Sequence, residues 1–238
     1  QSSPIPLGDT AILYGTQNLT HLNVADKSVK SKEYLSKLMV ARKQKYTDVV
    51  DTFEWPLDFN DGKFNSGNFH VRNGVFSKGG DRFYFSGCLE AERNKMLCKL
   101  YVTEYENDRW GNPVELGNNI NIDGASSTNP FITKVKKQEV LFFSSNREMQ
   151  SRGGYDIWYS VYDTRQKTYR RPQNAGKQIN TPGDEITPYY DDRKGILYFA
   201  SNGWKTMGGF DIYSAVGGPS RYVVNEEGKY VTNLGFPI

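Results

Sequence analysis

The sequence has very few of the side chains on which nucleophilic catalysis and metal binding usually depend. It contains two histidines, His21 and His70, and two cysteines. Neither a G-x-S-x-G nucleophile turn nor an H-E-x-x-H zinc motif is present. The two histidines are far apart in sequence, which disfavours a catalytic triad or a metal site built on them. The sequence therefore predicts no catalytic residue, no metal ion and no cofactor.

One hydrolytic chemistry stays open in spite of these absences. A glycosidase needs two carboxyl groups that flank the bond, and they need not be neighbours in sequence. Adjacent acidic pairs occur at Asp184–Glu185 and Asp191–Asp192. Both pairs lie in turn-like sequence, so we expect no enzymatic activity and keep glycan binding or cleavage as the alternative.

The sequence also lacks a large excess of charge and any long hydrophobic run. The formal net charge is +3, the sequence pI is about 8.6 and the mean hydropathy is −0.67. This balance is too weak to predict nucleic-acid binding. No apolar run is long enough to predict a membrane span. The chain starts at Gln1 without a signal peptide, so we expect a mature or excised segment of a longer protein.

Aromatic residues and turn-forming residues are abundant. The chain contains 16 Tyr and 13 Phe, together with 23 Gly and 10 Pro. Aromatic side chains favour the half-buried surface of a pleated strand, and Gly and Pro favour turns. The composition therefore predicts an all-β fold with many short strands.

A long repeat organises this predicted fold. An apolar run, a polar loop and the pattern Gly-Gly-aromatic-Asp-Ile-aromatic follow one another at 140–158 and again at 196–213. The copies are nearly in phase, since Leu197 follows Leu141 by 197 − 141 = 56 residues and Gly209 follows Gly154 by 209 − 154 = 55. Weaker copies begin at 82–86, where Arg82 matches Val140, and at 11–15.

The chain thus divides into four units, 1–66, 67–128, 129–184 and 185–238, each with room for four short strands. Such units predict a β-propeller of four-stranded antiparallel blades, either complete with four or part of a larger wheel. In the first unit, 37–41 is the best candidate for the third strand. The spacing of Val29, Leu35, Leu38 and Met39 also fits a short helical face there.

The Gly-Gly-aromatic-Asp motif has a structural explanation. Glycines allow a tight loop before a strand, and an Asp can accept hydrogen bonds from the amides of that loop. The second unit has Lys99 in place of the Asp, so the units do not form a ring of identical carboxylates. We therefore expect a role in blade structure for Gly153, Gly154, Asp156, Gly208, Gly209 and Asp211.

Two further groups of residues carry predictions. Cys88 and Cys98 could face each other across a hairpin as a disulfide, or be two small buried thiols. The loops after the second strands of the last two units carry Trp and Arg, residue types that often anchor interfaces. The predicted binding residues are Arg147, Arg152, Trp204 and Lys205.

The stretches "LYFASN…GGFDIY…NLGFPI" (197–238), "LFFSSN…GGYDIWYS" (141–160) and "INTPGDEITPYY" (179–190) together resemble a known repeat. It is the WD40-like β-propeller repeat of Bacteroidota envelope proteins of the OmpA family, which include a lipoprotein of the type IX secretion system. The second unit departs from the pattern because it lacks Gly-Gly-aromatic-Asp. The first departs through a lysine-rich insertion between Gln17 and Lys37.

This resemblance implies a non-catalytic, protein-binding scaffold in the periplasm, exported and associated with the outer membrane. The implied partners are other envelope or secretion-complex proteins, with peptidoglycan bound through flanking domains. It implies no nucleic acid, no membrane span and no cofactor. The alternatives are a β-propeller that binds or cleaves glycans, and a periplasmic adaptor like the TolB propeller or a passive spacer.

Overall fold

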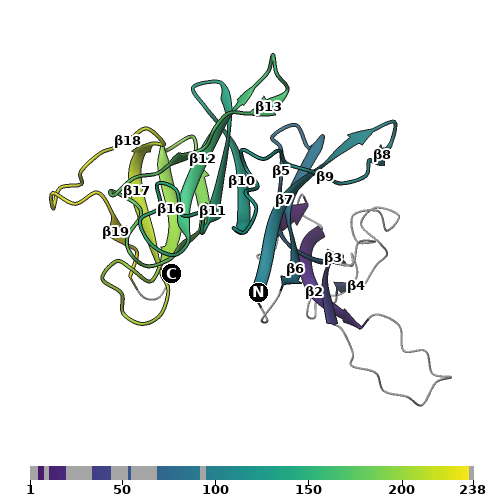
Figure 1. The fold of residues 1–238 in the computed structure, drawn as a ribbon, viewed down its shortest axis with the longest axis horizontal. Helices are drawn as coiled ribbons and strands as arrows, with labels where there is room; N and C mark the ends of the chain where they lie inside the picture. The colour runs from purple at the N-terminus through teal and green to yellow at the C-terminus, as the bar shows by residue number, and fades with distance from the viewer. Residues whose placement is uncertain are drawn as a thin grey trace.

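The computed structural model describes residues 5–7, 11–19, 34–43, 53–54, 69–91 and 95–235. These residues form four antiparallel sheets, which we call blades 1 to 4, arranged side by side as a fan (Figure 1). The all-β class and the four-stranded antiparallel blades predicted from the sequence are confirmed. Among the described residues, no helix is long and apolar enough to span a membrane.

Each blade pairs its strands in chain order. Blade 1 consists of β1 (Ile5–Leu7), β2 (Ala11–Leu19), β3 (Tyr34–Lys43) and β4 (Phe53–Glu54). Blade 2 consists of β5 (His70–Phe76), β6 (Arg82–Ala91), β7 (Lys95–Glu106), β8 (Arg109–Trp110) and β9 (Val114–Glu115). Blade 3 consists of β10 (Ser127–Val135), β11 (Gln138–Ser145), β12 (Asp156–Asp163), β13 (Thr168–Tyr169) and β14 (Gln173–Asn174). Blade 4 consists of β15 (Glu185–Asp191), β16 (Ile196–Ser201), β17 (Asp211–Gly218), β18 (Arg221–Tyr222) and β19 (Thr232–Asn233).

The structure adds three details to the expectation from the sequence. The outermost strand of blades 2, 3 and 4 is split into two short pieces that both pair with the third strand. The region around 34–43 is a strand and not a helix, because it pairs with all nine residues of β2. The sheet of blade 3 begins at Ser127, two residues before the start of the third sequence unit.

The innermost strands of blades 2, 3 and 4 share a β-bulge. Their register shifts between Arg72 and Gly74 in β5, between Thr128 and Phe131 in β10, and between Ile186 and Tyr189 in β15. A residue with positive φ lies at each shift: Asn73, Asn129 and Thr187. In blades 3 and 4 the next residue is proline, which cannot donate to the ladder and is tolerated at a bulge.

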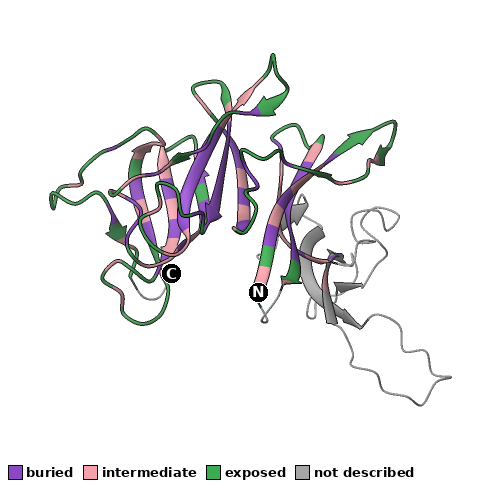
Figure 2. Ribbon diagram, viewed as in Figure 1, coloured by how far each residue is buried: buried purple, intermediate pink, exposed green. Residues whose placement is uncertain are grey.

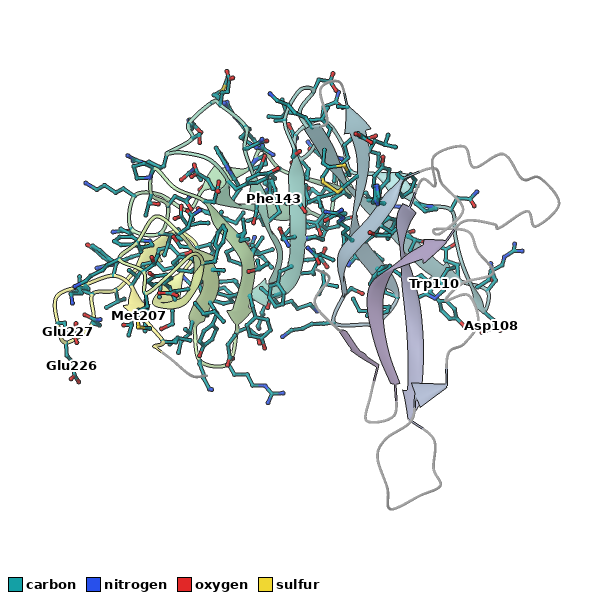
Figure 3. All side chains as sticks on the ribbon, turned by 90° about the horizontal axis from the view of Figure 1, so that it is seen from below. Asp108, Trp110, Phe143, Met207, Glu226 and Glu227 are labelled. Carbon is teal, nitrogen blue, oxygen red and sulfur yellow. A yellow bond between two sulfur atoms is a disulfide. The ribbon has the colours of Figure 1, made fainter. Side chains whose placement is uncertain are left out.

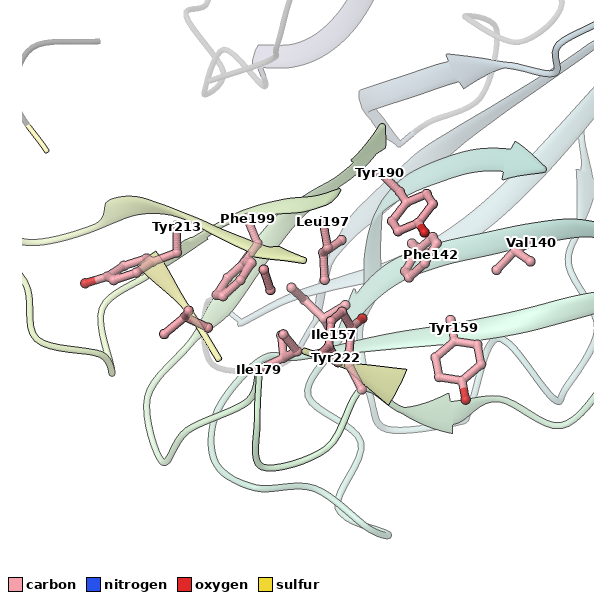
Figure 4. Packing of buried hydrophobic residues seen from close by; sticks show 13 residues of the cluster. Val140, Phe142, Ile157, Tyr159, Ile179, Tyr190, Leu197, Phe199, Tyr213 and Tyr222 are labelled. Carbon is pink, nitrogen blue, oxygen red and sulfur yellow. The ribbon is translucent and has the colours of Figure 1, made fainter. Parts of the chain in front are cut away.

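The hydrophobic core is divided into clusters that lie between neighbouring blades, and the buried strands form the centre of the fan (Figure 2). Phe143 belongs to the cluster between blades 2 and 3 and lies in the interior (Figure 3). The cluster between blades 3 and 4 brings Phe142 and Ile157 against Leu197 and Tyr213 (Figure 4). Each middle blade is therefore buried on both faces, which explains why second strands such as Val140–Phe143 are continuously apolar.

Candidate functional site

The Asp of the repeated motif holds its own loop in both copies. In blade 3, Asp156 Oδ2 accepts hydrogen bonds from the Arg152 amide (2.6 Å), Ser151 Oγ (3.1 Å) and Asn174 Nδ2 (2.8 Å). In blade 4, Asp211 Oδ2 accepts from the Met207 amide (2.7 Å) and Asn233 Nδ2 (3.0 Å). These contacts are the ones expected of a residue that shapes a blade.

Blade 2 makes the same connection with different chemistry. Lys99 takes the place of the Asp, and Glu115 takes the place of Asn174. The two side chains form an ion pair with an N–O distance of 2.8 Å. The hydrogen bond to Glu115 raises the pKa of Lys99. The link between the third and outermost strands is thus present in blades 2, 3 and 4, although the residues that form it differ.

Two of the four predicted binding residues, Arg147 and Trp204, form hydrogen bonds within the fold. Arg147 is 4% exposed and donates from Nη2 to the Ile120 carbonyl at 2.6 Å. Its guanidinium also lies over the Trp158 ring, 4.9 Å from the centroid. Burial lowers the pKa of Arg147 to about 10. The half-buried Trp204 donates from Nε1 to the Ile179 carbonyl at 2.8 Å.

Ile120 and Ile179 occupy equivalent positions in the segments that link successive blades. Arg147 and Trp204 therefore donate equivalent hydrogen bonds, each to the carbonyl of the isoleucine in its link. This corrects the prediction that Arg147 is an exposed interface anchor. Its guanidinium donates hydrogen bonds to the backbone carbonyls of Asn119 and Ile120 in this link. Arg152 and Lys205 are exposed.

Cys88 and Cys98 form a disulfide in the structure. They are directly opposite each other on β6 and β7, with their Cα atoms 4.0 Å apart. Of the two possibilities left open by the sequence, the structure therefore has the bridge.

A hollow of about 680 Å³ lies between the outer parts of blades 2 and 3. We call it the blade 2–3 groove. Its walls combine aromatic side chains, carboxylates and other polar groups. Trp110 lies on the outer part of blade 2 (Figure 3). The lining residues used below are Arg82, Tyr84, Glu104, Glu106, Trp110, Tyr162 and Tyr169.

A hydrogen-bonded cluster stands at one side of this groove. Arg82 donates to both carboxylate oxygens of Glu139, at 3.1 Å from Nη1 and 2.5 Å from Nη2. The Tyr169 hydroxyl lies 2.7 Å from Glu139 Oε1 and 3.1 Å from the Tyr84 hydroxyl. The Tyr162 ring lies against the Arg82 guanidinium, with 5.5 Å between its centroid and Cζ.

The titration of these groups suits hydrogen-bond donation at neutral pH. Burial raises the pKa of Tyr84 and of Tyr169 well above that of an ordinary tyrosine. Burial opposes the charge of Arg82, but its hydrogen bonds to Glu139 and the neighbouring acidic groups together outweigh burial and raise its pKa. Both hydroxyls therefore keep their protons, and Arg82 keeps its charge.

The polar character of the groove is not a consequence of the repeat. The interface between blades 3 and 4 has Val140, Val161 and Gly195 at the positions of Arg82, Glu104 and Glu139. Val140 is 2% exposed within a hydrophobic cluster. At the interface between blades 2 and 3, charged side chains thus occupy positions that are valine or glycine at the interface between blades 3 and 4, and such departures from a local rule are expected at functional sites.

Sequence reasoning did not select these residues. Arg82 and Glu139 are separated by 57 positions, and no short motif joins them. A signal was nevertheless present, because the alignment of the repeats already set a charged Arg82 against an apolar Val140. Charged residues at positions that are apolar in sister repeats would have indicated the groove.

No protein-family model matches the chain, and no curated protein matches it by sequence. Solved structures do match its fold. One is the GH93 α-L-arabinofuranosidase of Fusarium graminearum in complex with arabinobiose, at 15% identity and a TM-score of 0.53, over 97% of this chain and 67% of that one. Another is a thermostable family-43 glycoside hydrolase, at 12% identity and a TM-score of 0.53, over 98% of this chain and 73% of that one.

A third is the endo-arabinase of Bacteroides thetaiotaomicron, at 13% identity and a TM-score of 0.52, over 98% of this chain and 80% of that one. At these identities the likeness shows the fold, a β-propeller of antiparallel blades. It also contradicts two predictions made from the sequence. The solved propellers that resemble this chain are glycoside hydrolases, so the expected non-catalytic scaffold is wrong, and so is the expectation of no enzymatic activity.

Proposed function

We propose that this chain is a carbohydrate-active β-propeller that binds a glycan in the blade 2–3 groove and hydrolyses its glycosidic bonds. The observation that carries the proposal is the groove itself, where aromatic rings and charged groups occupy positions that are apolar at the next interface. A concave site with a few converging polar groups is the usual form of a small-molecule site.

The chemistry of the lining fits a sugar. Trp110, which also packs on Tyr105, and Tyr162 contribute aromatic surface to the lining, and sugar rings pack on such surfaces. The substrates we propose are arabinose-containing polysaccharides. Support comes from the likeness in fold to an arabinofuranosidase bound to arabinobiose and to an endo-arabinase.

Hydrolysis would require two carboxyl groups, one to protonate the leaving oxygen and one to act as base or nucleophile. Among the residues that line the groove we propose Glu104 and Glu106 for these roles, because residues i and i+2 of a strand lie on the same face and Glu104 stands opposite Arg82.

Sugar release from arabinan and a panel of other polysaccharides tests the proposal. Glu104→Gln and Glu106→Gln should each lower the rate by roughly 10²- to 10⁴-fold, as for loss of an acid or base. Trp110→Ala should weaken binding to immobilised polysaccharide, and Glu226→Gln, far out on blade 4, is the matched control (Figure 3). Full activity in both Gln variants would refute the roles of these carboxyl groups. A chain that neither binds nor cleaves any polysaccharide would refute the function.

We also propose that the protein works in an exported compartment, as the resemblance to envelope proteins implies. The Cys88–Cys98 disulfide supports this, because disulfides persist mainly in oxidising environments. The envelope partners implied by the same resemblance stay a prediction. Detection of the oxidised protein in the periplasmic fraction of its native cell, against a cytoplasmic marker, would test the location.

A further inference from the structure

Blade 4 has a sheet face on β16 and β17 that no other blade of the described residues covers. The repeat supplies the comparison, because the same face of blade 3 packs against blade 4. Ile157 in β12 is 0% exposed, whereas Ile212 at the equivalent position of β17 is 44% exposed. Val216, four residues further along β17, is 49% exposed. We call this surface the blade 4 outer face.

The same contrast appears beside the outermost strand. Leu116 in blade 2 is 8% exposed and Ala175 in blade 3 is 5% exposed, because the next blade covers both. Leu234 occupies the equivalent position of blade 4 and is 39% exposed. Two separate positions therefore show that blade 4 is built like blades 2 and 3 but lacks their neighbour.

The glycine loops give a third, independent contrast. A Cβ added at Gly153 would lie 2.3 Å from the carbonyl of Pro182, in the link that leads into the following blade. A Cβ added at Gly208, the equivalent residue of blade 4, would meet nothing within 4 Å. The loop of blade 4 thus keeps the glycines of a packed loop although Gly208 and Gly209 have open space around them.

We propose that the blade 4 outer face docks one further four-stranded blade of the same wheel, distinct from blades 1 to 4. The inner strands of that blade would present alternating apolar and aromatic side chains, as Leu197, Phe199 and Tyr213 do toward blade 3. We identify the occupant as a blade because the blade 4 outer face repeats the surface that blades 2 and 3 each use to pack against the next blade. The solved propellers support it, since nearly all of this chain aligns with only 67% to 80% of their lengths.

Blade 1 does not fill this position. It packs on the opposite side of the fan, where β3 lies against β5 of blade 2 (Figure 1). Leu38 of β3 is 1% exposed in the cluster with Phe83 and Phe85. The blade 4 outer face therefore forms one free edge of the fan in the part of the chain that the structure describes.

The test adds a further blade to the chain and measures how accessible position 212 is with and without it. A second copy of residues 180–238 is joined after Ile238, which continues the repeat because Gly235 to Ile238 matches Gly176 to Ile179. The only cysteines are bonded to each other, so Ile212→Cys provides a single reactive thiol. The matched control is Arg165→Cys, an exposed position on the β12–β13 hairpin of blade 3.

The labelling of Cys at position 212 by a thiol reagent should slow by tenfold or more in the extended chain, while labelling at position 165 stays the same. The extended chain should also unfold in one transition at a higher temperature. Equal labelling at position 212 in both chains would overturn the proposal. Protection at position 212 in the original chain through a stable dimer would overturn it too, because a second copy would then be the occupant.

Discussion

At the scale of single residues, Asp156 and Glu185 are the carboxyl groups that the fold buries completely among the described residues. Glu185 accepts hydrogen bonds from the Thr181 amide and from Ser201 Oγ, at 2.7 and 2.6 Å. Burial raises the pKa of both carboxyl groups, and the nearby charge of Asp156 adds to the rise at Glu185. The folded state therefore binds protons more tightly than the unfolded state at these positions.

Because the pKa of Glu185 is higher in the folded state than in the unfolded state, the stability of the protein should depend on pH. The stabilisation from Glu185 is fully present below its ordinary pKa of 4.5 and is lost as the pH rises through the raised value of the folded state. Glu185→Gln removes the titrating group. The Tm of this variant minus the Tm of wild type should therefore increase as the pH rises from about 4 to about 8. The expected change is on the order of 1 kcal/mol, or roughly 2–4 °C.

Thermal unfolding followed by circular dichroism across this range measures the difference. Glu226→Gln, an exposed carboxyl group on blade 4, is the control and should shift Tm equally at every pH. A Tm difference for Glu185→Gln that moves in the opposite direction would mean that the hydrogen bonds from Thr181 and Ser201 outweigh burial.

The sequence predicted the roles of some residues and not of others. The role of Asp156 and Asp211 was predictable, because an Asp after two glycines has its partners within its own loop. The role of Arg147 was not, since its partner Ile120 is 27 positions away and Arg is usually exposed. Contacts close in sequence leave local patterns, whereas contacts between blades are fixed only when the blades pack.

At the scale of elements, the two glycine loops allow a controlled comparison. Gly153→Ala places a methyl group against the backbone of Pro182, which cannot move without displacing the link between blades. We expect a loss of about 1–3 kcal/mol in the free energy of unfolding. Gly208→Ala meets open space, and it should be neutral or stabilise by up to about 1 kcal/mol through the unfolded state.

Chemical denaturation of the two variants measures both values. Because Gly153 and Gly208 occupy the same position of the repeat, their intrinsic preferences cancel in the comparison. Equal destabilisation would show that the loop conformation itself, and not the neighbouring blade, requires glycine.

The elements most accurately predicted were those with strong internal copies. The second strands at 140–145 and 196–201 were visible as apolar runs, although only the strand of blade 3 is covered on both faces. The third strand of blade 1 was ambiguous, because Val29, Leu35, Leu38 and Met39 fit two periods and only pairing with β2 decides between them. The split of each outermost strand into two pieces has no counterpart in the hydrophobic pattern.

At the scale of the whole molecule, each blade is stabilised mainly by its neighbours, so stability should vary along the fan. Blade 3 is covered on both faces, with Leu141, Phe142 and Phe143 all 0% exposed. Blade 4 is covered on one face, and its third strand alternates between buried and exposed residues. Regions with fewer buried apolar contacts open at a lower free-energy cost.

Hydrogen exchange should reveal this gradient. Amides in β11 and β12 should exchange at least roughly tenfold more slowly than those in β16 and β17, which corresponds to about 1.4 kcal/mol in the free energy of opening. Peptide-level mass spectrometry compares 140–145 with 196–201, two segments of the same repeat position and similar composition. Equal protection would mean that the four blades open as a single cooperative unit. If a further blade does dock on the blade 4 outer face, the extended chain should lose the difference between these two segments, because β16 and β17 would then be covered on both faces like β11 and β12.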